Sequence, residues 1–304
     1  MANFYGQYVG FGSSTVGAAQ VTFLGDKGVF GGGTDGAKLD VMEYISIPTT
    51  SNTSDFGNLS VNRSEFGAAS SGTRGVWGGG NTGVASDVID YVTIGTNGDA
   101  ADFGNITVDR SGNAACSDGI KGLYMGGEKD GPRNEIDYIT IASIGDAADF
   151  GNLTAGRYGI SSCGNGTRGL FGGGYSTSNV IDWVVVASLG DSTDFGNLTV
   201  GRRYFHACSN TTRAVFGGGY TGSSINVLDY VTVASAGDAA DFGNLTVARY
   251  GTAACANETN GVFGGGCCGY MNTIDYVVMA SLGDAADFGD LSGARQAATA
   301  CSGT

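Results

Sequence analysis

One short motif occurs six times in the sequence, and its regular spacing limits the folds open to this chain more than any other feature. Asp-Phe-Gly recurs at intervals of 47, 47, 45, 47 and 46 residues. The six copies begin at Asp55, Asp102, Asp149, Asp194, Asp241 and Asp287. An arginine stands eight residues after each aspartate, at Arg63, Arg110, Arg157, Arg202, Arg249 and Arg295. Repetition at such a period is typical of a repeat architecture, so each motif is interpreted as part of a repeat.

Asp-Phe-Gly is also the magnesium-binding motif of protein kinases. A kinase carries it once and needs a His-Arg-Asp catalytic loop and a strand lysine as well. This sequence has a single histidine, His206, which is followed by alanine. The kinase interpretation is therefore excluded.

Each repeat contains four predicted β-strands. In the unit from Arg157 to Gly201 the expected strands are 158–163, 168–171, 180–187 and 195–200, with glycine-rich turns between them. A run of glycines marks each unit, starting at Gly31, Gly78, Gly126, Gly172, Gly217 and Gly264. Four strands in a unit of about 40–50 residues are typical of one propeller blade. We therefore predict an all-β, six-bladed β-propeller.

The two ends of the chain predict how the ring closes. The C-terminal stretch "ARQAATACSGT" matches the first strand of a further blade that never continues, whereas the blade marked by Gly31 has only a degenerate first strand. We expect residues 296–301 to supply that strand, either to their own ring or to a neighbouring subunit, because a propeller must protect its strand edges. Residues 21–304 would then form the propeller. Residues 1–20 would form a glycine-rich arm whose aromatic side chains dock on a partner, on a sister subunit or on the propeller itself: Phe4, Tyr5, Tyr8 and Phe11.

The charge balance excludes some partners. The formal net charge is −14, whereas nucleic-acid binding requires a basic surface, and an anionic membrane surface is disfavoured for the same reason. The N-terminus has no continuous apolar run of the length that a membrane helix needs. We expect neither a nucleic-acid partner nor membrane insertion.

Most titratable residues are expected to be structural, and we expect no catalytic residue, no metal site and no cofactor. The six arginines should pair with acids of the repeat, either those of Asp-Phe-Gly or those of the acid–aromatic pairs such as Asp182-Trp183. His206 is interpreted as a hydrogen-bonded core residue, and Asp238 as a cap of its own turn. Five of the six repeats have a cysteine six residues after the repeat arginine, and the other has Ala69, so we interpret these cysteines as small buried residues without disulfides: Cys116, Cys163, Cys208, Cys255 and Cys301.

The loops after the glycine runs differ from blade to blade, although the strands hardly change. They read "TDGAKLD", "NTGVASD", "EKDGPRN", "YSTSN", "YTGSSIN" and "CCGYMN". All six should emerge on one face of the disc, and variable loops on a rigid scaffold are typical binding sites. The candidate binding residues in these loops are Tyr175, Tyr220, Tyr270, Lys129 and Arg133. Unselected drift of solvent-exposed turns is the alternative explanation.

The order of landmarks resembles the kelch family of propellers. That order is a repeat arginine, a glycine pair, an aromatic residue and a later aromatic, here Arg157, Gly172-Gly173, Trp183 and Phe195. The sequence departs from the family in having phenylalanine where a late tryptophan is usual. The resemblance implies the propeller architecture, and it does not imply the partners of kelch proteins. Copper enzymes of the galactose-oxidase type are excluded because they need several histidines, and the aspartate turns of sialidases are absent.

Repeated phrases such as "DFGNLTVAR" and "GVFGGG" also resemble the kelch-like proteins of tailed bacteriophages, especially phages of marine cyanobacteria. This resemblance implies a non-enzymatic protein of the virion with a structural or adsorption role. Its partners would be other virion proteins, sister subunits or a host surface glycan. A cellular kelch-like adaptor is the alternative, and a glycan-active enzyme is less favoured because only the loop "EKDGPRN" is rich in charge.

Overall fold

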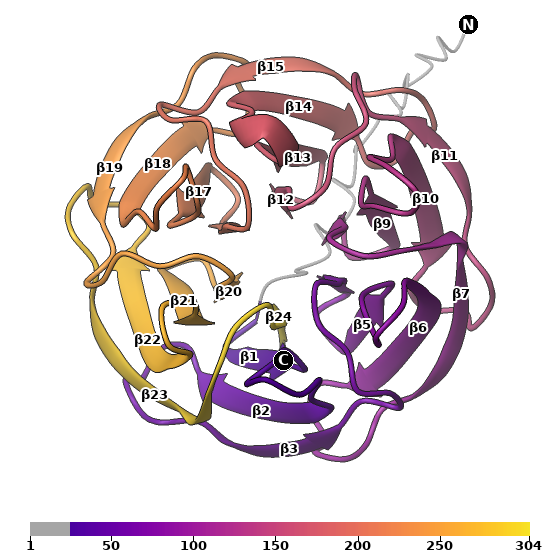
Figure 1. Ribbon diagram of the computed structural model, residues 1–304, viewed down its shortest axis with the longest axis horizontal. Coiled ribbons are helices and arrows are strands. Elements are labelled where there is room, and N and C mark those ends of the chain that lie inside the picture. The colour runs from indigo at the N-terminus through magenta and orange to yellow at the C-terminus, as the bar shows by residue number, and fades with distance from the viewer. Residues whose placement is uncertain (1–24) are drawn as a thin grey trace, which may run out of the picture.

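The computed structural model describes residues 25–304 and shows a ring of six four-stranded antiparallel sheets around a central channel (Figure 1). The predicted arm, with Phe4, Tyr5, Tyr8 and Phe11, lies outside the described residues. Within each blade the strands are ordered from the channel outwards. Blade 1 has β24 (Thr299–Gly303), β1 (Lys27–Gly31), β2 (Val41–Ser46) and β3 (Ser54–Asn58). Blade 2 has β4 (Gly67–Ser70), β5 (Arg74–Gly78), β6 (Ser86–Thr93) and β7 (Ala101–Arg110).

The other four blades repeat this order. Blade 3 has β8 (Ala114–Ser117), β9 (Lys121–Met125), β10 (Glu135–Thr140) and β11 (Ala148–Asn152). Blade 4 has β12 (Ser161–Gly164), β13 (Arg168–Gly172), β14 (Val180–Val185) and β15 (Thr193–Asn197), with the 3₁₀ turn η1 (Tyr175–Thr177) between β13 and β14. Blade 5 has β16 (His206–Ser209), β17 (Arg213–Gly217), β18 (Val227–Thr232) and β19 (Ala240–Asn244). Blade 6 has β20 (Ala253–Ala256), β21 (Asn260–Gly266), β22 (Met271–Val278) and β23 (Ala286–Arg295).

The C-terminal strand closes the ring, as the sequence predicts. β24 pairs antiparallel with β1, and Cys301 stands opposite Val29. Blade 1 is thus built from both ends of the described chain, and β1 has a partner on each side. Such closure removes the open edge that a sheet otherwise presents to other chains.

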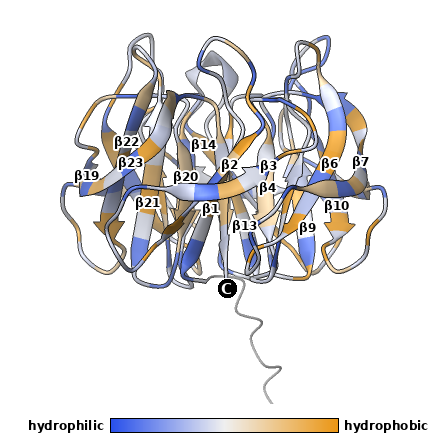
Figure 2. Cartoon of the chain, turned by 90° about the horizontal axis from the view of Figure 1, so that it is seen from below, coloured by the Kyte–Doolittle hydropathy of each residue, from blue (hydrophilic) through white to orange (hydrophobic). Residues whose placement is uncertain are grey.

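The two faces of the disc differ. We call the face that carries the six variable loops and the connectors from each outer strand to the next inner strand the loop face, and the opposite face the turn face. The C-terminus lies on the turn face (Figure 2). Gly25, the first described residue, lies there too, packed against Gly303.

The apolar core is divided among the gaps between blades. Six clusters of buried side chains are present, and each combines residues of two neighbouring blades. For example, Phe216 and Leu170 lie in one cluster, although they belong to blades 5 and 4. The blades therefore stabilise one another across their faces.

Asp-Phe-Gly joins neighbouring blades. In blade 5, Asp241 is exposed, whereas Phe242 is buried with its ring edge-on to Tyr230 at 5.9 Å. Gly243 has a φ of 146°, and a Cβ there would lie 2.3 Å from the carbonyl oxygen of Gly283 in blade 6. Only glycine allows these two backbone segments to approach each other so closely. The motif is therefore a contact between blades.

The aspartate of each Gly-Asp turn also binds the neighbouring blade, so the prediction that Asp238 caps its own turn is wrong. Its Oδ1 accepts hydrogen bonds from the backbone N and the Nδ2 of Asn197, at 2.9 and 3.1 Å. Asn197 ends the outer strand of blade 4, and Asp99, Asp146, Asp191 and Asp284 make the same pair of bonds. The reason is the curvature of the ring, which brings this turn closer to the preceding blade than to its own backbone donors.

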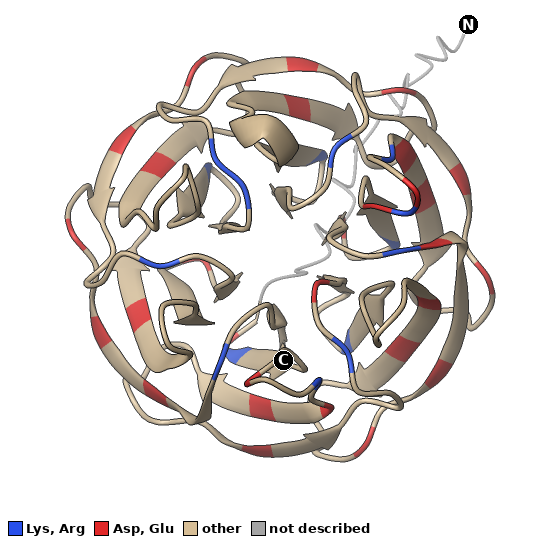
Figure 3. Cartoon of the chain, viewed as in Figure 1, with Lys and Arg blue, Asp and Glu red and all other residues tan. Residues whose placement is uncertain are grey.

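The six repeat arginines are buried in ion pairs. Each lies at the end of an outer strand or on the connector that follows it, and pairs with the acid of the acid–aromatic pair in the blade that follows, rather than with the acid of Asp-Phe-Gly. Figure 3 shows basic positions along the connectors and acidic positions on the strands. Arg202 Nη2, for example, lies 2.8 Å from Asp229 Oδ2. A serine or threonine hydroxyl donates to the same acid, as from Thr246 to Asp275 at 2.7 Å. This hydroxyl is the third residue of an Asn-x-Ser/Thr triplet, and its contact with the acid explains why the triplet recurs. The triplets begin at Asn58, Asn105, Asn152, Asn197 and Asn244.

Candidate functional site

A closed ring of backbone hydrogen bonds surrounds the mouth of the channel on the loop face. One residue of each connector donates its N–H to the carbonyl of the equivalent residue in the preceding blade, at 2.6 to 3.0 Å. We call these six residues the mouth ring: Glu65, Gly112, Gly159, Tyr204, Gly251 and Ala297. Their φ angles lie between 54° and 65°, which turns each peptide along the circumference of the ring. This contact fixes the connectors of all six blades relative to one another.

The mouth ring also explains a difference from the predicted strands. The first strand of blade 4 was expected at 158–163, yet β12 begins at Ser161. Gly159 cannot continue an extended strand because it adopts a φ of 63° in the mouth ring. The sequence alone does not reveal this contact, since its partners lie one blade away.

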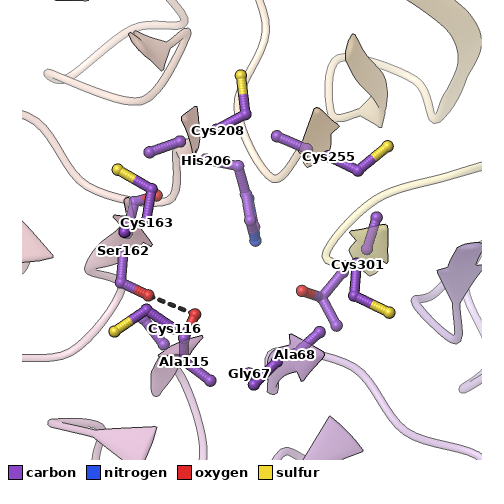
Figure 4. Close-up of a pocket in the computed structure, with 18 of the residues that line it drawn as sticks. Gly67, Ala68, Ala115, Cys116, Ser162, Cys163, His206, Cys208, Cys255 and Cys301 are labelled. Atoms are coloured by element: carbon purple, nitrogen blue, oxygen red, sulfur yellow. Dashed lines mark hydrogen bonds between the residues drawn. The ribbon is translucent and has the colours of Figure 1, made fainter. Parts of the chain in front are cut away.

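Below the mouth ring, the six inner strands enclose a channel of about 100 Å³ (Figure 4). The thiols of the repeated cysteines turn away from it into the gaps between blades, and all seven cysteines of the chain are free. Serine hydroxyls bond neighbouring inner strands, as from Ser117 to the Ser70 carbonyl at 2.7 Å. The channel wall is therefore made mainly of small side chains and backbone.

His206 is the exception, and its imidazole points into the channel (Figure 4). The prediction of a hydrogen-bonded core histidine is wrong for Nδ1, which is buried without a partner among the described residues. The physical reason is that the ring faces the channel rather than the polar backbone of its sheet. Burial lowers the pKa of His206 to about 4, so the imidazole is neutral at pH 7.

Aromatic side chains gather on one half of the loop face. Tyr158 stacks on Tyr175 with ring centroids 4.8 Å apart, and Tyr158 lies 6.5 Å from Tyr204. Tyr250 continues the series, at 6.4 Å from Tyr204 and 5.2 Å from Tyr220. We call these five residues, which come from blades 4 to 6 and their connectors, the tyrosine arc.

Arg203 lies within the tyrosine arc. Its guanidinium carbon is 5.2 Å from the ring centroid of Tyr204 and 5.5 Å from that of Tyr220, within the range of a cation–π contact. Paired backbone hydrogen bonds between Arg203 and Tyr220 hold the connector against the variable loop of blade 5. Sequence reasoning missed this arginine, although the doublet Arg202-Arg203 occurs in this one repeat and could have indicated it.

The five loop residues predicted to bind a partner do not form one site. Tyr175 and Tyr220 belong to the tyrosine arc, and Tyr175 is 45% exposed. Tyr270 is exposed on blade 6 and takes part in none of the aromatic contacts of the described residues. Lys129 and Arg133 lie on the loop of blade 3, where Lys129 pairs with Asp109 of β7 in blade 2 and Arg133 pairs with Glu135 of β10. Each charge thus already has an acidic partner in the framework.

Comparison with known proteins leaves the geometry as the main guide to function. No protein-family model matches the chain, and no curated protein matches it. The described residues, 25–304, contain no group of three or more His, Cys, Asp or Glu side chains placed to hold a metal ion. In the same part of the chain no helix has the length and apolar character to cross a membrane.

Proposed function

We propose that this protein is a non-enzymatic component of a bacteriophage virion, with a structural or adsorption role, and that it binds its partner through the loop face. The observation that carries the proposal is the separation of a constant frame from variable loops. The frame is tied by the arginine–acid pairs and the mouth ring, and all six variable loops leave it on the same face. A propeller built in this way suits binding of another macromolecule.

The opposite face suits attachment. Gly25, the first described residue, lies on the turn face, away from the variable loops. A chain anchored through the residues before Gly25 would present its loop face outwards. The phage assignment itself rests on the resemblance of the repeats to kelch-like phage proteins.

Immunogold labelling of purified virions tests the proposal. The virions are prepared from a lysate that contains the chain, and virions of an unrelated phage serve as the control. Gold at one fixed location on the particle is the expected result, with fibre labelling indicating adsorption and head labelling indicating decoration. Unlabelled virions, with the chain present only in the soluble fraction, would contradict the virion role and favour a cellular adaptor.

A further inference from the structure

The loop face is chemically uneven around the ring, and this unevenness indicates what binds there. The sector formed by blades 4 to 6 carries the tyrosine arc. Elsewhere on the same face there are acidic side chains. Blade 2 has Glu65 at the mouth-ring position that Tyr204 occupies in blade 5, and Glu128 lies on the variable loop of blade 3. A partner with sixfold symmetry would not require such a difference, so the sector from Tyr158 to Tyr250 is the candidate contact.

Arg203 is the basic side chain that has no hydrogen-bond or ion-pair partner in the part of the chain that the structure describes. All 15 lysines and arginines of the sequence lie at or after residue 27, within the described part. Each of the others forms a hydrogen bond or an ion pair there, for instance Lys38 with Ser64 at 2.6 Å. Among residues 25–304, Arg203 makes neither with its side chain, and its Nε is buried without an acceptor. The chain has a net charge of −14, and Arg203 lies between two tyrosine rings with its terminal guanidinium N–H groups unpaired within the described residues. These groups are available to bind the anionic group of a ligand.

The groups around Arg203 indicate that the ligand carries hydroxyl groups as well as an anionic group. Burial is the largest cause that raises the pKa of Tyr204, to about 12, and Glu65 and Glu128 raise it further. The Tyr204 hydroxyl is therefore protonated at pH 7 and can donate a hydrogen bond. The carboxylate of Glu65, which lines the same mouth, and that of Glu128, whose charge acts on Tyr204, can accept hydrogen bonds. A fitting ligand combines one carboxylate with several hydroxyl donors.

The available area favours a small ligand over a protein. Four of the five tyrosines are already half-buried, and only Tyr175 is widely exposed. At roughly 200 Å² for each aromatic side chain, the arc offers on the order of 300 Å² of free surface. A stable protein interface needs about 800 Å² on each partner. A sugar fits this area, because its apolar face can pack on the aromatic rings while its rim carries hydroxyl groups.

We propose that the tyrosine arc and Arg203 form a binding site for a carboxylated sugar, a uronic- or sialic-acid unit of a glycan, whose carboxylate pairs with Arg203. The sugar ring packs on Tyr175 and its neighbours, and its hydroxyls bond to the tyrosine hydroxyls and to Glu65. This inference deepens the proposed function, because it names the chemical class that the loop face recognises.

Isothermal titration calorimetry with defined oligosaccharides tests the site. The probes are trigalacturonate and 3′-sialyllactose, with methyl-esterified trigalacturonate and lactose as the uncharged counterparts. We expect the acidic forms to bind at least about tenfold more tightly, as one arginine–carboxylate pair would give. Equal affinity for the acidic and uncharged forms would overturn the assigned pairing.

Matched variants separate the site from general charge effects. Arg203→Gln should weaken the binding of trigalacturonate by about tenfold, and Tyr175→Ser should weaken it for acidic and neutral sugars alike. Lys38→Gln removes one positive charge from the same face and should leave affinity unchanged. Equal losses in Arg203→Gln and Lys38→Gln would overturn the site. Absence of binding by any probe to folded protein would overturn the sugar proposal and favour a protein partner, whereas particle labelling would still decide the virion role.

Discussion

Arg295 of β23 forms a buried ion pair with Glu43 of β2, and this contact joins residues that are 252 positions apart in the chain. It is the same arginine–acid pair that the other five connectors make, but here it links blade 6 to blade 1. The hydroxyl of Ser292 also donates to Glu43. Burial raises the pKa of Glu43, although Arg295 acts in the opposite direction. The closing blade is therefore held by side chains as well as by the pairing of β24 with β1.

Removing the arginine of this closing pair should destabilise the whole ring. Arg295→Met leaves Glu43 buried without its cation, which is expected to lower the free energy of unfolding by about 3–5 kcal/mol. The double variant Arg295→Met/Glu43→Leu should recover most of that loss, because no charge then remains buried. Urea denaturation followed by circular dichroism measures both effects.

The ion pair between Arg133 and Glu135 supplies the control for this experiment. It joins the same residue types at 3.2 Å, but both side chains are about one-third exposed. Arg133→Met should cost less than about 1 kcal/mol. Similar losses in Arg133→Met and Arg295→Met would contradict the importance of burial.

Deleting residues 296–304 should prevent the ring from closing. The deletion removes β24 and Ala297 of the mouth ring, and it exposes the inner edge of β1. We expect the truncated chain to associate or to lose cooperative unfolding, and we expect the full chain to have the mass of one subunit in light scattering. Deletion of Thr304 alone is the control. A truncated chain that stays monomeric and melts like the full chain would show that β24 does not hold the ring.

The cysteines and glycines of neighbouring blades predict a difference between two equivalent substitutions. A Cβ on Gly169 would lie 2.6 Å from the Sγ of Cys116, whereas on Gly122 it would lie 3.3 Å from the Cβ of Ala69. Gly169→Ala should therefore cost about 1–3 kcal/mol by overpacking, and Gly122→Ala distinctly less. Thermal unfolding of the two variants measures the difference.

A second substitution tests the cause of that difference. Cys116→Ala in the Gly169→Ala background should restore part of the lost stability, because it removes the sulfur in the way. Ala214 already occupies the equivalent position in blade 5, where it is buried in the same cluster as Cys163 of blade 4. A gap between blades can thus accept a methyl group at this position. Equal melting temperatures for Gly122→Ala and Gly169→Ala would contradict this explanation.

The sequence predicted the framework because the framework is periodic. The six Asp-Phe-Gly copies gave the blade number, and the unfinished repeat after Arg295 gave the closing strand. Contacts between blades were harder to predict: Asp238 binds Asn197 across a gap that no local pattern indicates. The tyrosine arc was missed for a related reason. Tyr158, Tyr204 and Tyr250 are far apart in sequence, and only the curvature of the ring brings them together.

The single histidine makes the stability of the ring depend on pH. Burial in the channel lowers the pKa of His206 from 6.5 to about 4. Between these two values the unfolded chain binds a proton that the folded chain excludes, so the folded state loses stability as the pH falls. At 1.36 kcal/mol for each pH unit, His206 accounts for up to about 3 kcal/mol of that loss. The other polar groups that line the channel are serine and threonine hydroxyls and the Asn113 amide, which do not titrate in this window, and Glu65 borders the mouth of the channel.

His206→Gln tests this dependence, since glutamine has a similar size and does not titrate. Urea denaturation at pH 7.5 and pH 4.5 should show a smaller loss of stability in the variant than in the wild-type chain. Ser162→Ala, which removes another side chain of the channel wall, should leave the wild-type pH dependence in place. If His206→Gln and the wild-type chain lose the same stability between the two pH values, the imidazole takes up its proton in the folded state, and the channel must then supply it with water or an anion.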